Sequence, residues 1–153
     1  MSKNNVGYEG VTGPDGIGVR AVRQRVLYSD MTDSTTTGTY ALPVTIPAGS
    51  FVIGTKVDVL TGFTGGTNTT AVMDVGDGSD ADKFSYTTFN VYTAATGLME
   101  QADAGDAGTE TGLALVTSDA TPTLTVTVSA DYTTISAGEL EIAIYYLETS
   151  NLT

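Results

Sequence analysis

The sequence of 153 residues contains no cysteine, no histidine and no tryptophan. Without cysteine the chain can form no disulfide and offers no thiolate to a metal. Without histidine it lacks the commonest general base near neutral pH, so neither a Ser-His-Asp nor a Cys-His mechanism can be assembled. A Walker loop and a dinucleotide-binding glycine motif are also missing. These absences predict a protein that is not an enzyme and that needs no cofactor.

Positive charge is scarce, because six Lys and Arg residues stand against 18 Asp and Glu, for a net charge of −12. Nucleic acids and anionic membrane surfaces are bound through clustered Lys and Arg, so we expect neither as a partner. Apolar runs stay far below the ~20 residues that a membrane-spanning helix needs. The N-terminal residues are polar and lack the apolar core of a signal peptide, which predicts synthesis in a cytoplasm without secretion.

The few cations are concentrated near the N-terminus. Residues 1–25 contain Lys3, Arg20, Arg23 and Arg25 against two acidic residues, whereas the rest of the chain has two lysines against 16 acidic residues. One interpretation is a solvated strand. The other is a docking edge for an acidic partner or for the acidic body of a neighbouring subunit. We take these four residues as candidate contacts to a partner.

Turn residues and alternating apolar positions divide the chain into strands. The Gly-rich residues 1–16 predict a flexible, extended N-terminal arm, which precedes a single domain over residues 17–153. Two polar segments, 30–38 and 94–111, predict loops, the second of them long and exposed. One or two short strands are expected in the aromatic-rich segment 84–92. The other predicted strands cover residues 18–28, 40–46, 51–61, 71–75, 113–117, 123–129 and 139–147.

The alternation also predicts which side chains face the core. The pattern is clearest in three strands and assigns to their inward faces Phe51, Ile53, Thr55, Val57 and Val59, then Leu124, Val126 and Val128, and finally Leu140, Ile142, Ile144 and Tyr146. About eight strands without an amphipathic helix predict an all-β fold. We expect an antiparallel β-sandwich that is jelly-roll-like and carries an extended N-terminal arm.

The most specific polar motif places four aspartates, Asp74, Asp77, Asp80 and Asp82, within nine residues that are punctuated by glycine. Calcium prefers six to eight oxygen ligands supplied in this manner, so these residues are candidate calcium ligands. Their spacing does not match an EF-hand loop. The alternative, which we favour, is an acidic turn between two strands, because Asp and Gly satisfy turn geometry.

Several segments resemble small virion structural proteins of tailed bacteriophages. They are Leu42–Gly54, in which a strand runs into a Pro-Ala-Gly turn, its continuation Val57–Phe63, and the segments Met73–Phe84 and Ala137–Tyr146. Within that group the chain looks most like a capsid decoration (cement) protein. The resemblance implies a homotrimer on the outer capsid surface of the virion, made in the host cytoplasm, that binds the major capsid protein lattice and stabilises the shell.

Two other functions remain open from the residues. One is a receptor- or glycan-binding module of a phage fibre or tail tip, where tyrosines stack on a sugar. The other is an enzyme acting on a polysaccharide, which requires a carboxylate pair across a cleft, and no pair is singled out here. The tyrosines available for stacking, for which core or interface packing is the alternative role, are Tyr86, Tyr92, Tyr132, Tyr145 and Tyr146.

Overall fold

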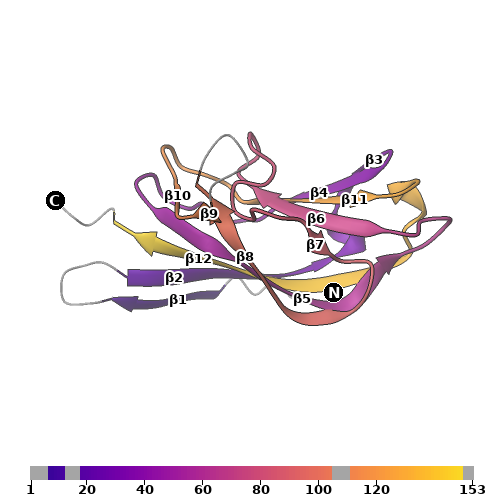
Figure 1. Ribbon diagram of the computed structural model, residues 1–153, viewed down its shortest axis with the longest axis horizontal. Helices are drawn as coiled ribbons and strands as arrows, with labels where there is room; N and C mark the ends of the chain where they lie inside the picture. The colour runs from indigo at the N-terminus through magenta and orange to yellow at the C-terminus, as the bar shows by residue number, and fades with distance from the viewer. Residues whose placement is uncertain (1–6, 13–17, 105–110, 150–153) are drawn as a thin grey trace.

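A computed structural model describes residues 7–12, 18–104 and 111–149 of the chain. In these residues two antiparallel sheets pack face to face (Figure 1). The seven-stranded sheet has the order β1 (Gly7–Thr12), β2 (Gly18–Leu27), β12 (Ala137–Glu148), β5 (Phe51–Thr64), β8 (Ala95–Asp103) and β9 (Thr111–Gly112), with β10 (Ala114–Leu115) also paired to β5. The five-stranded sheet has the order β3 (Thr32–Ser34), β4 (Thr37–Ala41), β11 (Thr123–Val128), β6 (Ala71–Gly76) and β7 (Phe89–Asn90).

Helical structure in the described part of the chain is limited to two single turns of 3-10 helix, η1 (Tyr28–Asp30) and η2 (Tyr132–Thr134). No helix there is long and apolar enough to cross a membrane. Each turn joins strands at one end of the sandwich. η2 begins with Asp131, whose side chain accepts a hydrogen bond from the backbone N–H of Thr133, as a capping residue does.

The strand pairing is that of a jelly roll. When β2, β4, β5, β6, β7, β8, β11 and β12 are taken in chain order, the first pairs with the last, the second with the seventh, the third with the sixth and the fourth with the fifth. A long antiparallel ribbon folded over on itself has this pairing, which gives the two Greek keys of a jelly roll. Contacts of β12 with β5 and of β11 with β6 complete the two sheets. The predicted jelly-roll-like β-sandwich is therefore confirmed.

The core lies between the two sheets and is built from the inward faces that alternation predicts. In β11 and β12 all seven predicted inward side chains are buried, and so are Val22 and Val26 of β2 and Met73 and Val75 of β6. Full burial of one such aliphatic side chain stabilises the fold by about 1.5–3 kcal/mol. Polar residues between them face outward, so each strand contributes to the core and to the surface in turn.

Both segments predicted to be loops contain strands, so these two predictions are wrong. β8 occupies half of segment 94–111 and pairs with β5 over Gly54–Val59. β3 and the start of β4 form a hairpin within segment 30–38. These strands lie at or near sheet edges, where backbone hydrogen bonds hold them and few apolar side chains are needed. Because these strands are polar, they lack the alternation of apolar residues by which a strand is predicted from sequence.

The chain after β4 is irregular where a strand over residues 40–46 was expected. Leu42, Val44 and Ile46 are buried as alternation predicts, but the sheet ladder ends at Ala41. Beyond it the backbone N–H of Ile46 donates to the Ala120 carbonyl at 2.8 Å. Proline within the segment has no N–H to donate, which is consistent with the loss of regular pairing.

A β-bulge in β5 reverses the predicted orientation of its first residues. Tyr145 of β12 pairs with Gly54, but the next residue, Tyr146, pairs with Val52. The extra residue, Ile53, shifts the alternation, so Val52 is buried while Phe51 and Ile53 are half-exposed on the outer face. The prediction that Phe51 and Ile53 face the core is therefore wrong. A one-residue shift in register turns the side chains on the N-terminal side of the bulge in β5 to the opposite face of the sheet.

Part of the predicted N-terminal arm belongs to the sheet. Residues 7–12 form β1, which pairs antiparallel with β2 from Gly7 opposite Arg23 to Thr12 opposite Gly18. The other residues of the segment 1–16, including Lys3, lie outside the described residues. The division into a flexible arm and a domain over residues 17–153 stays a prediction.

Candidate functional site

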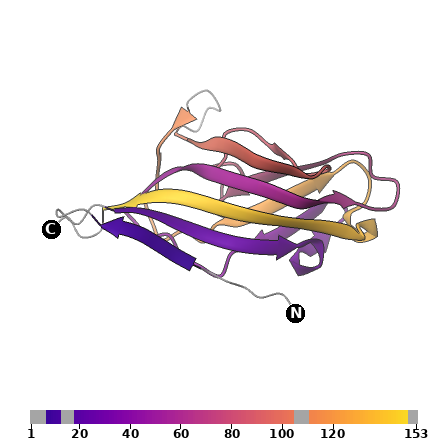
Figure 2. The same cartoon turned by 90° about the horizontal axis from the view of Figure 1, so that it is seen from below.

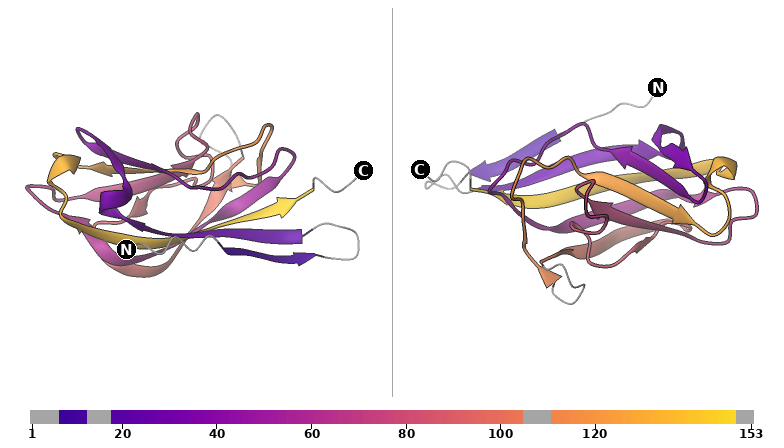
Figure 3. Two further views of the ribbon diagram at one scale, coloured as in Figure 1. Left: turned by 180° about the vertical axis from the view of Figure 1, so that it is seen from behind. Right: turned by 90° about the horizontal axis from the view of Figure 1, so that it is seen from above.

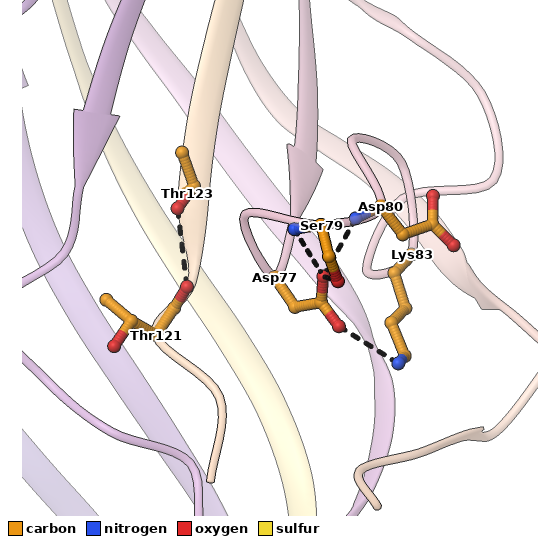
Figure 4. Close-up of polar contacts among 6 residues, drawn as sticks. All are labelled: Asp77, Ser79, Asp80, Lys83, Thr121 and Thr123. Carbon is orange, nitrogen blue, oxygen red and sulfur yellow. Dashed lines mark hydrogen bonds and ion pairs between the residues drawn. The ribbon is translucent and has the colours of Figure 1, made fainter. Parts of the chain in front are cut away.

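The acidic segment after β6 forms a tight turn that is held by its own side chains (Figure 4). Asp77 Oδ1 accepts hydrogen bonds from Ser79 N at 3.0 Å, Ser79 Oγ at 2.7 Å and Asp80 N at 2.9 Å. Asp77 Oδ2 accepts from Lys83 Nζ at 3.0 Å. Gly78, between them, has a left-handed backbone with φ of +89°. An aspartate that hydrogen-bonds the backbone two and three residues onward is the usual closure of such a turn.

The electrostatics of this turn follow from these contacts. Although burial raises the pKa of Asp77, the hydrogen bonds from Asp80, Ser79 and Lys83 outweigh it and hold that pKa well below its usual range. Burial, and then the Asp82 carboxylate, raise the pKa of Asp74. Burial and a side-chain hydrogen bond with Asp82 raise the pKa of Asp80. The carboxylate of Asp77 is thus the one most strongly held in its charged form.

These four aspartates are not arranged as ligands of a single ion. Among the described residues, no three acidic side chains come close enough together to hold a metal. Asp77 directs both carboxylate oxygens at donors of its own turn, while Asp80 and Asp82 share a hydrogen bond. The geometry supports the acidic turn, and calcium binding by Asp74, Asp77, Asp80 and Asp82 stays a prediction without further support.

The predicted docking edge on β2 is not an edge, since β1 pairs with one side of β2 and β12 with the other. Arg20 forms an ion pair with Glu148 of β12, and Arg25 forms one with Glu139. Surface pairs of this kind contribute about 0–1 kcal/mol to stability. Arg23 lies on the outer face of the sheet between Gly7 and Ala143. The cations of β2 are therefore integrated into the sheet surface.

A row of apolar side chains crosses the outer face of the seven-stranded sheet, at the end where β12 finishes. Figure 2 shows three strands of this sheet, β2, β12 and β5, side by side. Val19 of β2 pairs with Leu147 of β12, Leu147 pairs with Phe51 of β5, and Phe51 pairs with Leu115 of β10. Val19 and Leu115 are each 46% exposed, and the two side chains between them are half-buried. We call Val19, Leu147, Phe51 and Leu115 the apolar strip.

Cationic side chains lie on the second outward row from the apolar strip, beyond the row that contains Tyr145. On this second row, four residues along β12 from Leu147, Arg23 of β2, Ala143 of β12 and Lys56 of β5 are cross-strand neighbours. Lys56 Nζ lies 2.8 Å from Asp58 Oδ2. That hydrogen bond raises the pKa of Lys56, despite the opposing effect of desolvation. The outer face thus combines exposed apolar surface with charged side chains of both signs.

The outer face of the five-stranded sheet differs in its side chains. Figure 3 (right) shows the molecule from the side of this sheet. Threonines are paired across β4 and β11, with Thr39 opposite Thr125 and Thr37 opposite Thr127. Asp74 of β6 continues the first of these rows. In the described part of the chain, every exposed large apolar side chain belongs to the seven-stranded sheet or to the residues next to it, namely Val19, Leu60, Met99, Leu113 and Leu115.

Sequence reasoning missed the apolar strip because its members are far apart in the chain and meet only through strand pairing. The bulge in β5 also hides Phe51, which periodicity assigns to the core. The signal that was available is the end of β12, where the outward positions Tyr145 and Leu147 are apolar while Glu139 and Glu141 are charged. This pattern indicates that the outer face becomes apolar near the end of β12, but it does not indicate which other strands contribute to the apolar strip.

Comparisons with known proteins identify a shared fold. No protein-family model matches the chain, and no curated protein matches its sequence. Among solved structures, it is similar to a chain of the cyanophage Pam1 capsid asymmetric unit, with a TM-score of 0.52 and 19% identity over 96% of this chain and 91% of that one. Chains from the acidic stable capsid of Helicobacter pylori bacteriophage KHP30 (TM-score 0.47, 12% identity, 94% of each chain) and from the capsid of Ralstonia phage GP4 (TM-score 0.45, 17% identity, 87% and 86%) are more distant.

Proposed function

We propose that this chain is a non-enzymatic structural protein of a phage virion, of the decoration (cement) kind, which binds the major capsid protein lattice on the outer capsid surface. The observation that carries the proposal is the jelly roll that it shares, over 96% of its length, with a chain of the cyanophage Pam1 capsid asymmetric unit. The phage-like segments of the sequence point in the same direction. A shared fold alone does not fix a function, so the proposal depends on the surface as well.

The described surface suits a protein that acts by binding. An exposed apolar strip and neighbouring charges of both signs are features of protein interfaces. Of the five tyrosines considered for sugar stacking, Tyr132 and Tyr146 are 3% and 2% exposed, so they belong to the core. The receptor- or glycan-binding alternative thus loses two of its candidate contacts.

The proposed mechanism is stabilisation by mass action. A protein that binds the assembled shell and not its separated subunits lowers the free energy of the assembled state, by about 2.7 kcal/mol per site when its free concentration is 100 times Kd. In a homotrimer, which we also propose, three linked contacts raise the overall avidity without any new kind of contact. Because each shell offers many equivalent sites, modest binding at each site protects the whole shell.

The experiment that tests the proposal is co-sedimentation of the purified protein with empty shells that lack it, scored as copies bound per capsid subunit. The proposal expects saturable binding at a ratio set by the lattice, together with a raised melting temperature of the shell. Sedimentation equilibrium of the free protein tests the trimer. If the protein is folded and monodisperse but does not bind to shells at micromolar concentration, the proposal is contradicted. Binding to a glycan array in its place would favour the receptor-binding alternative.

A further inference from the structure

The methionines of the described residues differ sharply in exposure. Met99 in β8 is 67% exposed, whereas Met31 is 8% exposed and Met73 in β6 is fully buried. Met1, the fourth methionine of the sequence, lies outside the described residues. Oxidants attack the sulfur-containing side chains of a protein first, and a buried thioether is harder to reach than an exposed one. Because the chain contains no cysteine, its thioethers are the groups that an oxidant meets first.

The place of Met99 in the seven-stranded sheet explains its exposure. Met99 is the cross-strand partner of Lys56, and both lie on the outer face, since Val57 beside Lys56 is buried. β9 pairs with β8 at Ala102 and Asp103, and among the described residues no strand lies beyond β8 at Met99. Water and small solutes therefore reach the Met99 side chain both from the face of the sheet and from its edge.

The sulfur of Met31 is shielded by a polar contact as well as by burial. The hydroxyl group of Tyr132, a buried residue, donates to Met31 Sδ at 2.8 Å, with the Tyr28 carbonyl oxygen at 3.3 Å as a second acceptor. The contact engages a sulfur lone pair, and lone-pair electrons are what an electrophilic oxygen must take. Met31 is thus protected although it lies nearer the surface than Met73.

Oxidation would have opposite consequences at the buried and the exposed positions. Met73 faces the core from β6, where Val126 and Phe89 are its cross-strand partners. A sulfoxide oxygen there would be a buried acceptor without a donor, which costs about 1–3 kcal/mol. At Met99 the same oxygen would be hydrated on the outer face, so no buried contact would be lost.

We propose that Met99 is an oxidation site of this protein, at which hydrogen peroxide converts the thioether to a sulfoxide while the fold stays intact. A lone pair of the Met99 sulfur attacks one peroxide oxygen, the S–O bond forms, the O–O bond breaks, and water leaves after a proton transfer. The sulfur loses two electrons, and these reduce the peroxide. This inference does not depend on the proposed function. It assigns oxidative modification to the one described methionine whose product leaves the core unchanged.

The sequence makes the test direct, because trypsin places each described methionine in a separate peptide. The peptides are 26–56 with Met31, 57–83 with Met73 and 84–153 with Met99. The folded protein is incubated with hydrogen peroxide at neutral pH, and the gain of one oxygen atom in each peptide is followed over time by mass spectrometry. The same reaction in urea, where the chain is unfolded, is the control that removes the protection of the fold.

In the folded protein Met99 should be oxidised at least roughly tenfold faster than Met31 and Met73, and in urea the three rates should agree within about twofold. Met99→Leu, which nearly conserves volume, should abolish the fast reaction, while Met31→Leu should leave it unchanged. Protein oxidised at Met99 alone should keep its Tm within about 2 °C. Similar rates at the three methionines in the folded protein would overturn the proposal. A rate difference that persists in urea, or a larger fall in Tm on oxidation of Met99, would overturn it as well.

Discussion

Replacing Asn68 by alanine should destabilise the protein strongly, because this one amide joins two loops at the end of the sandwich opposite the apolar strip. The Asn68 side chain is almost fully buried, with 6% of the residue exposed. Its Nδ2 donates to the carbonyl oxygens of Gly65 at 3.0 Å and Asp131 at 2.8 Å, and contacts Thr134 Oγ1 at 3.2 Å. Its Oδ1 accepts from the backbone N–H groups of Ala130 at 2.8 Å and Asp131 at 3.1 Å.

The magnitude follows from four hydrogen bonds, because the two N–H groups of Nδ2 serve three nearby acceptors and Oδ1 accepts two bonds. Each contributes about 1 kcal/mol net, which sets an upper estimate of ~4 kcal/mol. Water replaces some partners at the rim of the loops, so we expect a loss of about 3 kcal/mol in the free energy of unfolding. For a chain of this size that corresponds to a fall in Tm of roughly 6–12 °C.

Urea unfolding followed by circular dichroism measures the effect. Asn68→Asp keeps an acceptor for the two backbone N–H groups but places a buried carboxylate oxygen against the carbonyls of Gly65 and Asp131, so at pH 7 it should be at least as unstable as Asn68→Ala. Thr67→Ala, at the exposed neighbouring position, is the control and should change stability by less than about 0.5 kcal/mol. A loss below about 1 kcal/mol in Asn68→Ala, with an unchanged m-value, would refute the reasoning.

Three further predictions concern single positions. Gly38→Ala should lower stability by about 1–3 kcal/mol in thermal unfolding, because a Cβ at Gly38 would overlap the buried ring of Tyr132; an unchanged Tm would contradict this. Asp77→Asn should destabilise the fold at pH 7, where the Asp77 carboxylate binds Lys83. Because the folded pKa of Asp77 lies below the unfolded value of about 3.9, the stability advantage of the wild type over this variant should shrink as the pH falls below about 4. A difference in stability that does not change with pH would contradict this. Asp74→Asn should raise Tm at pH 7, because burial and a neighbouring carboxylate raise the pKa of Asp74. The contribution of Asp74 to stability is complete below about pH 3.9 and is lost as the pH rises through its folded pKa. No gain in Tm at pH 7, or an equal gain at pH 3, would argue against this.

The fold class could be predicted from the sequence because burial in a two-layer sandwich imposes a period of two on each central strand. Leu124, Val126 and Val128 alternate with threonine in β11, and they are buried as expected. The acidic turn could also be predicted, since aspartate and glycine determine such turns through bonds to their own backbone. These features are local, so neighbouring residues in the chain contain the information they require.

The edge strands and the partner contacts could not be predicted in the same way. β8 is held by backbone hydrogen bonds to β5, which act almost independently of side-chain type, so its polar sequence predicted a loop. Arg20 and Arg25 seemed available to a partner until the structure placed Glu148 and Glu139 beside them. In both cases the decisive neighbour lies on a strand that is distant in the sequence.

Composition, charge and local periodicity by themselves determined that this chain is an all-β sandwich with a Thr-rich surface, and that it contains neither histidine nor cysteine. Only the tertiary structure decided where its exposed apolar side chains meet. The strip from Val19 to Leu115 exists because β2, β12, β5 and β10 pair in one register and a single bulge turns Phe51 outward. Register is fixed by the packing of the whole sandwich, and a shift of one residue exchanges core for surface, so a sequence pattern alone does not reveal it.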